Sequence, residues 1–455
     1  MDREIVMRYS KISFAVAMAL GSAGVANVAS AAPPTLSQAA GASIDLYTAG
    51  PTAARYGLIY DLQVNLCGSG NSLTVSSTTG AVHFYAVSCV VSASSGLSIA
   101  GQLATVYFRE QDDAIVGAVP LISGRSIDQL NLNDTTNIPS CPSGATQCTA
   151  TVGGGGSGEN FTGAVIKKPL QLGITDLEPS IFVSDNYPSS FPTSDYGSAT
   201  PAQMASLSTQ PLFQQVFGLF VNVNNTAFQK SGVTPASLNI PKAVLTNILQ
   251  ANLTDWSLVS DTSGNAVTSS SVPIHVENRE AGTGSRAATA VYFTGDECLS
   301  NAVSLVDSAG ATGDFFSPGN VLNAANLAAG SLTYASIDNY STTTYPNLVL
   351  VNINGLPPSN FNAAVGTYDY WFESTAQTAA SLTGNPLVLA NWLISELQEE
   401  TTTSGRDDIN AIPGLTASNN PTLPVSLSGF VPPSGTATIY VGQFTRAGSS
   451  CDTLL

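Results

Sequence analysis

Charged side chains are scarce in this chain of 455 residues, where they make up 10% of the sequence. Basic residues are the scarcer kind, with 14 Lys and Arg against 31 Asp and Glu, which gives a net charge of −17. A field of that sign repels polyanions, and no basic stripe along the sequence offsets it. Nucleic acids and anionic membranes are therefore excluded as partners. The surface must be filled largely by Ser, Thr, Asn and Gly, which fits a secreted protein better than a cytosolic one.

Histidine is also rare, with His83 and His275 far apart in the sequence. A Ser-His-Asp hydrolase needs a histidine and a nucleophile elbow of the form G-x-S-x-G, and the sequence has no such elbow. A zinc site would need closely spaced ligands such as C-x2-C, which are absent too. The neighbouring Asp112 and Asp113 point to opposite sides of an extended segment, which favours a solvated turn over a glycosidase pair. We expect no catalysis, no cofactor and no metal.

Long apolar runs are confined to the start of the chain. Residues 1–31 have the parts of an export signal peptide: a basic start, an apolar run over about residues 12–25, and Ala-Ser-Ala at residues 29–31 as a cleavage site. Beyond it no stretch reaches the roughly 18 apolar residues that span a bilayer. No cysteine follows the apolar run in the manner of a lipoprotein. We expect a soluble product in the periplasm or outside the cell.

Six cysteines in an exported chain predict three disulfides. Sequence alone allows 15 pairings. Proximity along the chain favours Cys67 with Cys89, Cys141 with Cys148, and Cys298 with Cys451.

One stretch, residues 272–293, predicts an anion site. Its first half alternates as a half-buried strand does, its second half has helical spacing, and R-E-A-G-T-G-S (residues 279–285) lies between them. A helix that restarts after glycines presents unpaired N–H groups and a positive dipole end, and an arginine can hold an oxyanion through two bonds. The plainer interpretation is a tight turn with Ser285 as a helix N-cap.

The run R-E-A-G-T-G-S resembles the R-x-x-G-[ST]-G-[ST] segment of the phosphate-binding periplasmic proteins of ABC transporters and their secreted relatives, the PstS-like and DING-type proteins. Other segments resemble family motifs in the same order. They are residues 44–53 (strand, small-residue loop and helix), 172–180 (G-x-S-D), 217–224 (the first interlobe strand), 248–256 (a helix end, with Ala251 in place of glycine), 332–336 (G-x-I-G-Y-x-S) and 354–368 (N-G-x-x-P-S…G-x-Y). Leu73 to Val91 alternates like a hairpin and resembles an insertion relative to the family.

The resemblance implies a set of ligand-binding residues. They are Thr48, Thr52, Asp176, Arg279, Thr283, Gly284 and Ser285. Asp176 has two interpretations: it caps the helix start before Leu177, or its carboxylate accepts the proton of hydrogen phosphate, which sulfate cannot offer.

The sequence departs from the family after the expected second strand. Where the family has a glycine- and serine-rich loop, residues 104–114 carry no glycine and three carboxylates. This departure leaves two alternatives: either the phosphate site is altered, or Arg109 replaces the missing donors.

The fold that the resemblance implies is α/β, the two-lobe type II periplasmic-binding-protein fold with β-rich insertions. Lobe 1 would combine residues 32–218 with 348–455, and lobe 2 would comprise residues 219–347. The apolar run of residues 348–353 would be the strand that returns to lobe 1.

The function expected is capture of phosphate or a similar oxyanion in the cleft between the lobes, without catalysis, with an ABC transporter permease as a partner. One alternative is an extracellular structural or adhesive protein that self-associates. Another is a secreted phosphatase, for which the sequence offers no evident nucleophile or metal ligands.

Overall fold

The computed structural model describes most of the chain after residue 31. The described residues are 32–80, 82–111, 114–154, 160–188, 196–230, 238–299, 304–306, 313–398, 415–417 and 445–451. The expected signal peptide and the pair Asp112 and Asp113 lie outside them. The described residues all belong to one compact unit.

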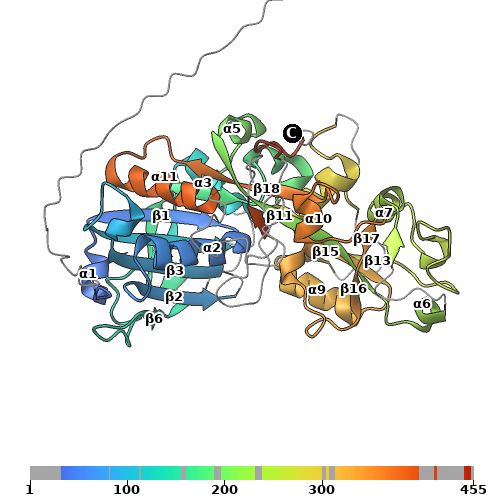
Figure 1. Ribbon diagram of the computed structural model, residues 1–455, viewed down its shortest axis with the longest axis horizontal. Coiled ribbons are helices and arrows are strands. Elements are labelled where there is room, and N and C mark those ends of the chain that lie inside the picture. Colours follow the sequence, from blue (N-terminus) through green and yellow to red (C-terminus); the bar gives the residue numbers. More distant parts are fainter. Residues whose placement is uncertain are drawn as a thin grey trace, which may run out of the picture. The chain divides into compact units, whose positions relative to one another are not determined.

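The α/β class is confirmed by a large mixed sheet, with helices on its faces (Figure 1). Along the sheet the strands follow the order β14 (Asp314–Phe315), β13 (His275–Arg279), β15 (Ser331–Ser336), β11 (Thr209–Asn222), β18 (Trp371–Thr378), β10 (Leu172–Thr175), β1 (Ile44–Gly50), β4 (Leu103–Gln111), β3 (Val82–Val90), β2 (Leu73–Thr79) and β6 (Gln147–Thr149). Two further strands pair with β11: β16 (Leu348–Leu350) and β19 (Leu415–Ala417).

The helices are short, apart from one near the end of the described chain. Their bounds are α1 (Leu36–Ala40), α2 (Arg55–Tyr60, continued by a π-helix Asp61–Leu66), α3 (Val119–Ser123), α5 (Pro201–Ser206), α6 (Thr226–Lys230), α7 (Lys242–Leu249), α8 (Gly284–Thr289, continued by a π-helix Ala290–Thr294), α9 (Pro318–Leu327), α10 (Asn360–Ala364) and α11 (Gly384–Gln398). Helix α11 buries Leu389, Leu393 and Leu397 in the same apolar cluster as Leu46 of β1 and Phe213 of β11.

Smaller sheets accompany the large one: β5 (Ser126–Leu130) with β9 (Val165–Pro169), β7 (Val152–Gly154) with β8 (Phe161–Gly163), and β12 (Asn239–Ile240) with β17 (Asn352–Ile353). The hairpin expected from residue 73 to 91 is confirmed, because β2 and β3 pair antiparallel from Leu73 with Ser88 to Thr79 with Val82.

Strand β11 joins the two halves of the large sheet. Its first part pairs with β18, and its last part, from Phe217, pairs with β15. Residues 348–353, expected to form one strand that returns to the first half, instead form β16 and β17, which pair with the end of β11 and with β12. The return runs through β18, which pairs with both β10 and β11. Val351 separates the two short strands and donates its N–H to Leu219.

The helix expected to run to Trp256 ends earlier, at Leu249. Ala251, which stands where the resembling family has glycine, has φ +55°, a left-handed conformation that ends a helix. The side chain of Trp256 is fully buried and donates from Nε1 to the carbonyl of Gly330 at 2.7 Å.

Two backbone segments approach so closely beside β10 that neither tolerates a side chain. A Cβ added to Gly173 would lie 1.6 Å from the carbonyl oxygen of Gly117, and one added to Gly117 would lie 2.0 Å from that of Ile174. This contact fixes the position of β10, and Asp176 is the residue that directly follows this strand.

We expect Gly173→Ala to lower the free energy of unfolding by about 3 kcal/mol or more, because backbone, not a flexible side chain, must move. Gly41→Ala is the matched control, since an added Cβ there lies 3.5 Å from the nearest atom, an ordinary contact. Its effect should stay within about 0.5 kcal/mol. Urea unfolding of both variants measures the difference, and equal stabilities would contradict the close approach.

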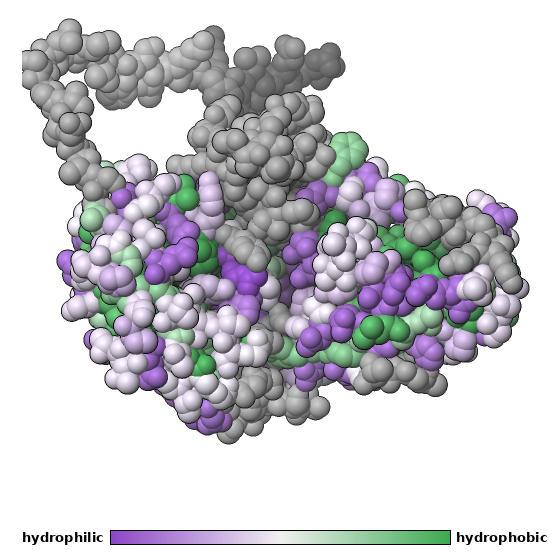
Figure 2. Space-filling view, turned by 90° about the horizontal axis from the view of Figure 1, so that it is seen from below, coloured by the Kyte–Doolittle hydropathy of each residue, from purple (hydrophilic) through white to green (hydrophobic). Residues whose placement is uncertain are grey.

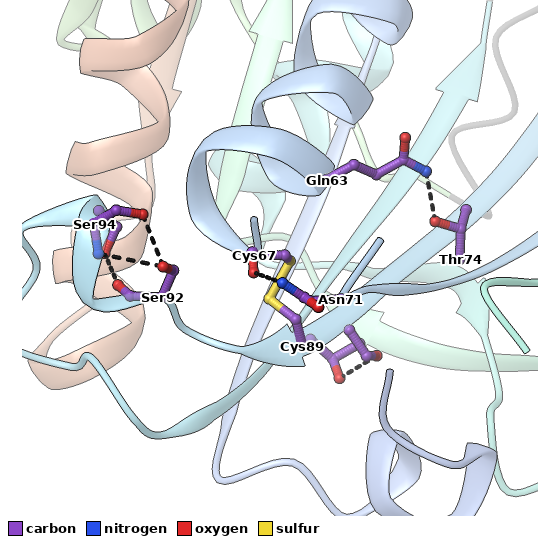
Figure 3. Close-up of a disulfide and its surroundings, with 10 residues drawn as sticks. Gln63, Cys67, Asn71, Thr74, Cys89, Ser92 and Ser94 are labelled. Carbon is purple, nitrogen blue, oxygen red and sulfur yellow. Dashed lines mark hydrogen bonds between the residues drawn. A yellow bond between two sulfur atoms is a disulfide. The ribbon is translucent and has the colours of Figure 1, made fainter. Parts of the chain in front are cut away.

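Three disulfides stabilise the fold, and they are the pairs that proximity along the chain favours: Cys67–Cys89, Cys141–Cys148 and Cys298–Cys451. Figure 3 shows the first, which ties the end of the helix after α2 to β3. Beside it, Gln63 Nε2 donates to Thr74 Oγ1 at 2.8 Å and connects the same helix to β2.

The segment 445–451 is held on the fold by two buried glutamates. Glu373 accepts hydrogen bonds from the backbone N–H groups of Arg446 and Gly448 at 3.1 and 2.9 Å. Glu178 accepts from the N–H and the hydroxyl of Ser450 at 2.6 and 2.5 Å. Because Glu178 lies two residues after Asp176, the segment also supports the loop that carries Asp176.

Burial raises the pKa of Glu178 to about 7, although the Ser450 hydrogen bonds lower it and Glu373 adds a further increase. A carboxyl whose pKa is raised in the folded state stabilises it fully below about pH 4.5 and loses that contribution as the pH rises through 7. We expect Glu178→Gln to remove this loss. The stability of the variant relative to the wild type should therefore rise by about 2–4 kcal/mol between pH 4.5 and pH 8. Urea unfolding of both proteins at several pH values measures this change. If their free energies of unfolding depend on pH in the same way, the raised pKa of Glu178 is contradicted.

Within the described ranges, no helix is both long and apolar enough to cross a membrane.

Candidate functional site

The glycine turn joins β13 to α8. Gly282 has φ +90°, a conformation that favours glycine, and its carbonyl accepts a hydrogen bond from the N–H of Ala114 at 3.0 Å. Thr283 is the N-cap of α8, and its hydroxyl donates to the carbonyl of Glu280 at 2.7 Å, closing the turn. Gly284 and Ser285 are the first helical residues. The strand, turn and helix expected from the sequence are therefore present.

Arg279 ends β13 and is held rigidly in a buried position. Its Nη1 donates to Ser285 Oγ at 2.7 Å, and its Nε and Nη2 donate to the carbonyls of Phe315 and Phe316 at 3.1 and 2.6 Å. Its backbone N–H donates to the hydroxyl of Tyr334 at 3.2 Å. Burial raises the pKa of Tyr334, although the nearby Arg286 and Arg279 lower it, so the phenol stays protonated. The guanidinium is thus placed before any ligand arrives, which lowers the entropy cost of binding.

Arg286 is a second cation at the turn. Its Nη1 donates to the carbonyl of Arg279 at 2.9 Å and lies 3.4 Å from Asp314 Oδ1. Its contacts support the backbone of the turn.

Arg279 lines a polar cavity whose volume is about 30 Å³. A water molecule needs roughly 10–15 Å³ on this measure, so the cavity has room for a larger group. The cavity is lined by Pro51, Thr52, Ala53, Asp176, Gln215, Phe217, Arg279, Gly284, Ser285, Pro318, Ser336 and Asn339. We call it the polar cavity. Figure 2 shows hydrophilic side chains facing a hollow in the middle of the face that it displays.

The topology of the sheet brings these residues together. The segments after β1, β10 and β15, and the end of β13, all line the polar cavity, and each lies at the carboxyl end of its strand. Ligands of open α/β sheets bind at this end, where helices begin and their N–H groups point outward. Three helical starts meet here: a short 3-10 helix (Thr52–Ala54), α8 at Gly284 and α9 at Pro318, whose proline itself has no N–H.

Five of the seven expected ligand residues line the polar cavity: Thr52, Asp176, Arg279, Gly284 and Ser285. Thr48 and Thr283 do not belong to this lining. The Thr48 hydroxyl is buried within the sheet and donates to the carbonyl of Tyr107 at 2.7 Å, because Thr48 lies in the interior of β1. The Thr283 hydroxyl closes the turn through Glu280. Both side chains bond to the protein's own backbone.

Asp176 and Gly284 are in direct contact across the polar cavity. A Cβ added to Gly284 would lie 2.1 Å from Asp176 Oδ2, so only glycine lets the carboxylate lie against the first turn of α8. The dipole of that turn favours the negative charge of Asp176. Asp176 as a whole is 7% exposed and forms part of the polar wall.

Gln215, Ser336 and Asn339 also line the polar cavity and were not expected as ligand residues. The buried Oε1 of Gln215 has no hydrogen-bond partner, a costly state that a donor in the cavity would relieve. A sequence signal existed for Gln215, since Gln214 and Gln215 interrupt the largely apolar run of residues 211–221. Asn339 Nδ2 donates to Ser336 Oγ at 2.7 Å, which orients both side chains.

Arg109 does not line the polar cavity, so the idea that it replaces the missing donors is wrong. It is fully buried, and its Nη2 donates to Gln111 Oε1 at 2.7 Å and to the hydroxyl of Tyr196 at 2.5 Å. Its guanidinium lies over the rings of Phe84 and Phe161 at 5.7 and 5.2 Å. The aromatic neighbours come from distant segments, which the local sequence of residues 104–114 cannot reveal.

Among the described residues, no group of three or more His, Cys, Asp and Glu side chains is arranged to hold a metal ion. The chemistry that the polar cavity offers is hydrogen bonding to an anion from one arginine, hydroxyl groups and helix N–H groups, with one carboxylate as acceptor.

No protein-family profile matches the chain, and a search of curated proteins finds no relative of similar sequence. Several solved structures resemble its fold. A high affinity periplasmic phosphate-binding protein bound with phosphate, PfluDING, is 12% identical with a TM-score of 0.41, over 88% of this chain and 91% of its own. An ABC-type phosphate transport receptor from Vibrio cholerae is 16% identical with a TM-score of 0.33, over 51% of this chain and 75% of its own.

PstS from Borrelia burgdorferi is 13% identical with a TM-score of 0.30, over 52% of this chain and 76% of its own. At these values the likeness carries no argument about this chain, and its function must be argued from its own residues.

Proposed function

We propose that this protein captures phosphate or a similar tetrahedral oxyanion in the polar cavity and does so without catalysis. The observation that carries the proposal is the convergence of Arg279, Ser285, Gly284 and Thr52 on one small cavity at the carboxyl ends of strands. A buried guanidinium, hydroxyl donors and helical N–H groups favour a compact anion despite the net charge of −17, because local dipoles act at shorter range than the overall field.

Asp176 gives the proposed site its selectivity. A carboxylate in the wall repels a fully ionised anion but accepts a hydrogen bond from a protonated one. Hydrogen phosphate carries such a proton at neutral pH, whereas sulfate does not. The proposed ligand is therefore phosphate or its close analogues.

The proposal extends to the setting of the protein. The chain would be exported to the periplasm or beyond by residues 1–31. Two lobes, residues 32–218 with 348–455 and residues 219–347, would close on the anion by a hinge motion, and an ABC transporter permease would receive it. The disulfides of the structure fit an oxidising compartment.

Calorimetric titration tests the proposal. The purified protein, unfolded in guanidinium with its disulfides intact and refolded to remove any bound anion, is titrated with phosphate and then with sulfate. We expect micromolar or tighter binding of phosphate and much weaker binding of sulfate. Absence of heat with phosphate, in protein whose melting curve shows that it has refolded, would contradict the proposal.

A further inference from the structure

A second, larger cavity adjoins the polar cavity. Its volume is about 500 Å³, within the range of about 300–1,000 Å³ typical of small-molecule sites. Thr52 and Pro318 line both cavities, so the two lie side by side. We call the larger one the side cavity. Phosphate alone needs no such space.

A cluster of charged and polar side chains forms one wall of the side cavity. Arg55 Nη1 lies 2.8 Å from His83 Nδ1 and 3.1 Å from Glu110 Oε2, and His83 Nδ1 lies 3.1 Å from the same carboxylate oxygen. The three residues come from α2, β3 and β4. The Glu110 side chain is 2% exposed, whereas those of Arg55 and His83 are 15% and 23% exposed. The carboxylate thus anchors the arginine and the imidazole at the wall.

The charges of this wall balance, and the rest of the lining is small and polar. Arg55 and Glu110 offset each other, and Ser317, Asn320 and two glycines complete much of the lining. A second anion would find no excess positive charge here, and an apolar group would find few apolar contacts. The wall offers hydrogen-bond donors and acceptors to a neutral, hydroxylated group.

We propose that the ligand is a phosphate monoester of a sugar or polyol, with its phosphate in the polar cavity and its hydroxylated part in the side cavity. This inference rests on the proposed function, because it places a phosphate group at Arg279. The monoester would bind as its monoanion, whose remaining proton Asp176 accepts and whose pKa is about 6. His83 belongs to the β2–β3 hairpin, the segment that resembles an insertion relative to the phosphate-binding family. The hairpin thus supplies part of the site for the organic half of the ligand.

The test compares inorganic phosphate, glucose 6-phosphate and glucose as probes, titrated into the wild-type protein and two variants. Gly319→Trp fills the side cavity, because Gly319 lines it and an added Cβ meets only the Tyr345 hydroxyl, at 3.8 Å. His83→Ala removes the imidazole without adding bulk. Neither residue lines the polar cavity. Melting curves establish that both variants are folded.

We expect the wild type, titrated at about pH 6 so that part of the monoester keeps a proton for Asp176, to bind glucose 6-phosphate at least as tightly as inorganic phosphate. Glucose should show no measurable binding. Each variant should weaken glucose 6-phosphate about tenfold or more and change inorganic phosphate less than about twofold. This inference would be overturned if the protein bound inorganic phosphate but not glucose 6-phosphate, or if neither variant selectively weakened binding of glucose 6-phosphate. Either result would leave the proposed function standing. Binding of neither phosphate compound would overturn both.

Discussion

Replacing Arg279 with alanine should weaken phosphate binding about 100-fold or more, the largest effect expected from a single side chain of the polar cavity. Charge-assisted hydrogen bonds from a buried guanidinium contribute about 1.5–3 kcal/mol each, and a factor of 100 corresponds to about 2.7 kcal/mol. The Arg279 guanidinium is fixed at the cavity wall by Ser285 and the carbonyls of Phe315 and Phe316. Calorimetric titration of the variant with phosphate measures the loss.

Two further variants make this prediction specific. Arg279→Lys keeps the charge but not the planar fork, so we expect an intermediate loss of about tenfold. Arg286→Ala removes the neighbouring cation, which does not line the polar cavity, and should cost less than about fivefold through its weaker, indirect charge effect. Equal losses in Arg279→Ala and Arg286→Ala would show that general positive charge, and not contact with Arg279, holds the anion.

Because Arg279→Ala removes a donor to the Phe316 carbonyl and one of two donors to the Phe315 carbonyl, the other being the Glu280 N–H at 3.0 Å, its stability must be measured beside its affinity. We expect a fall of about 1–3 kcal/mol in the free energy of unfolding, small enough for a folded variant. Urea unfolding separates this effect from the loss of binding.

Asp176→Asn should change the choice between anions. The asparagine has nearly the same shape, so the contact with Gly284 persists, but it carries no charge and can donate a hydrogen bond. Phosphate should lose a proton acceptor and bind about tenfold more weakly, while sulfate, no longer facing a carboxylate, should bind about tenfold more tightly. The ratio of the two affinities should therefore fall about 100-fold, which competition titration measures.

Asp338→Asn is the matched control for Asp176→Asn. Asp338 lies between Ser336 and Asn339 and accepts a hydrogen bond from Asn339 Nδ2 at 3.3 Å, but it does not line the polar cavity. The substitution makes the same exchange of a carboxylate for an amide of nearly the same shape. It should alter phosphate and sulfate binding by similar factors. If the ratio of phosphate affinity to sulfate affinity were unchanged in Asp176→Asn, the role of the Asp176 carboxylate in selecting phosphate would be contradicted.

The sequence was most informative where a motif is contiguous. Arg279, Gly284 and Ser285 lie within seven residues, and the strand, turn and helix that they form could be read from local patterns. Asp176 and Thr52 were found through their order along the chain. The β2–β3 hairpin likewise follows from alternation and turn residues, whereas the α/β class was expected from the resemblance of ordered motifs.

What the sequence could not show depends on which strands become neighbours. Gln215 and Asn339 line the polar cavity because β11 and β15 lie side by side in the sheet, far from each other along the chain. The interpretation of Arg109 as an anion donor failed because its guanidinium packs against the rings of Phe84 and Phe161, which belong to other strands. Thr48 was expected as a ligand residue from the resemblance of residues 44–53 to a family motif, yet its position within β1 turns its hydroxyl to a backbone carbonyl.

The strand expected over residues 348–353 shows the same limit. An apolar run predicts a buried strand, and both β16 and β17 form there. Their partners are the end of β11 and β12, whereas β18 makes the return to β10. Hydrophobicity predicts burial, but the pairing of strands depends on the whole topology.

The most direct test of an anion site at the glycine turn is a crystal structure of the protein grown with arsenate, an analogue of phosphate with a strong anomalous signal. The account predicts an anomalous peak in the polar cavity, within hydrogen-bonding distance of Arg279 and Ser285 through its oxygens. A protein that crystallises in millimolar arsenate with no peak in that cavity, or with its peak elsewhere, would contradict the account.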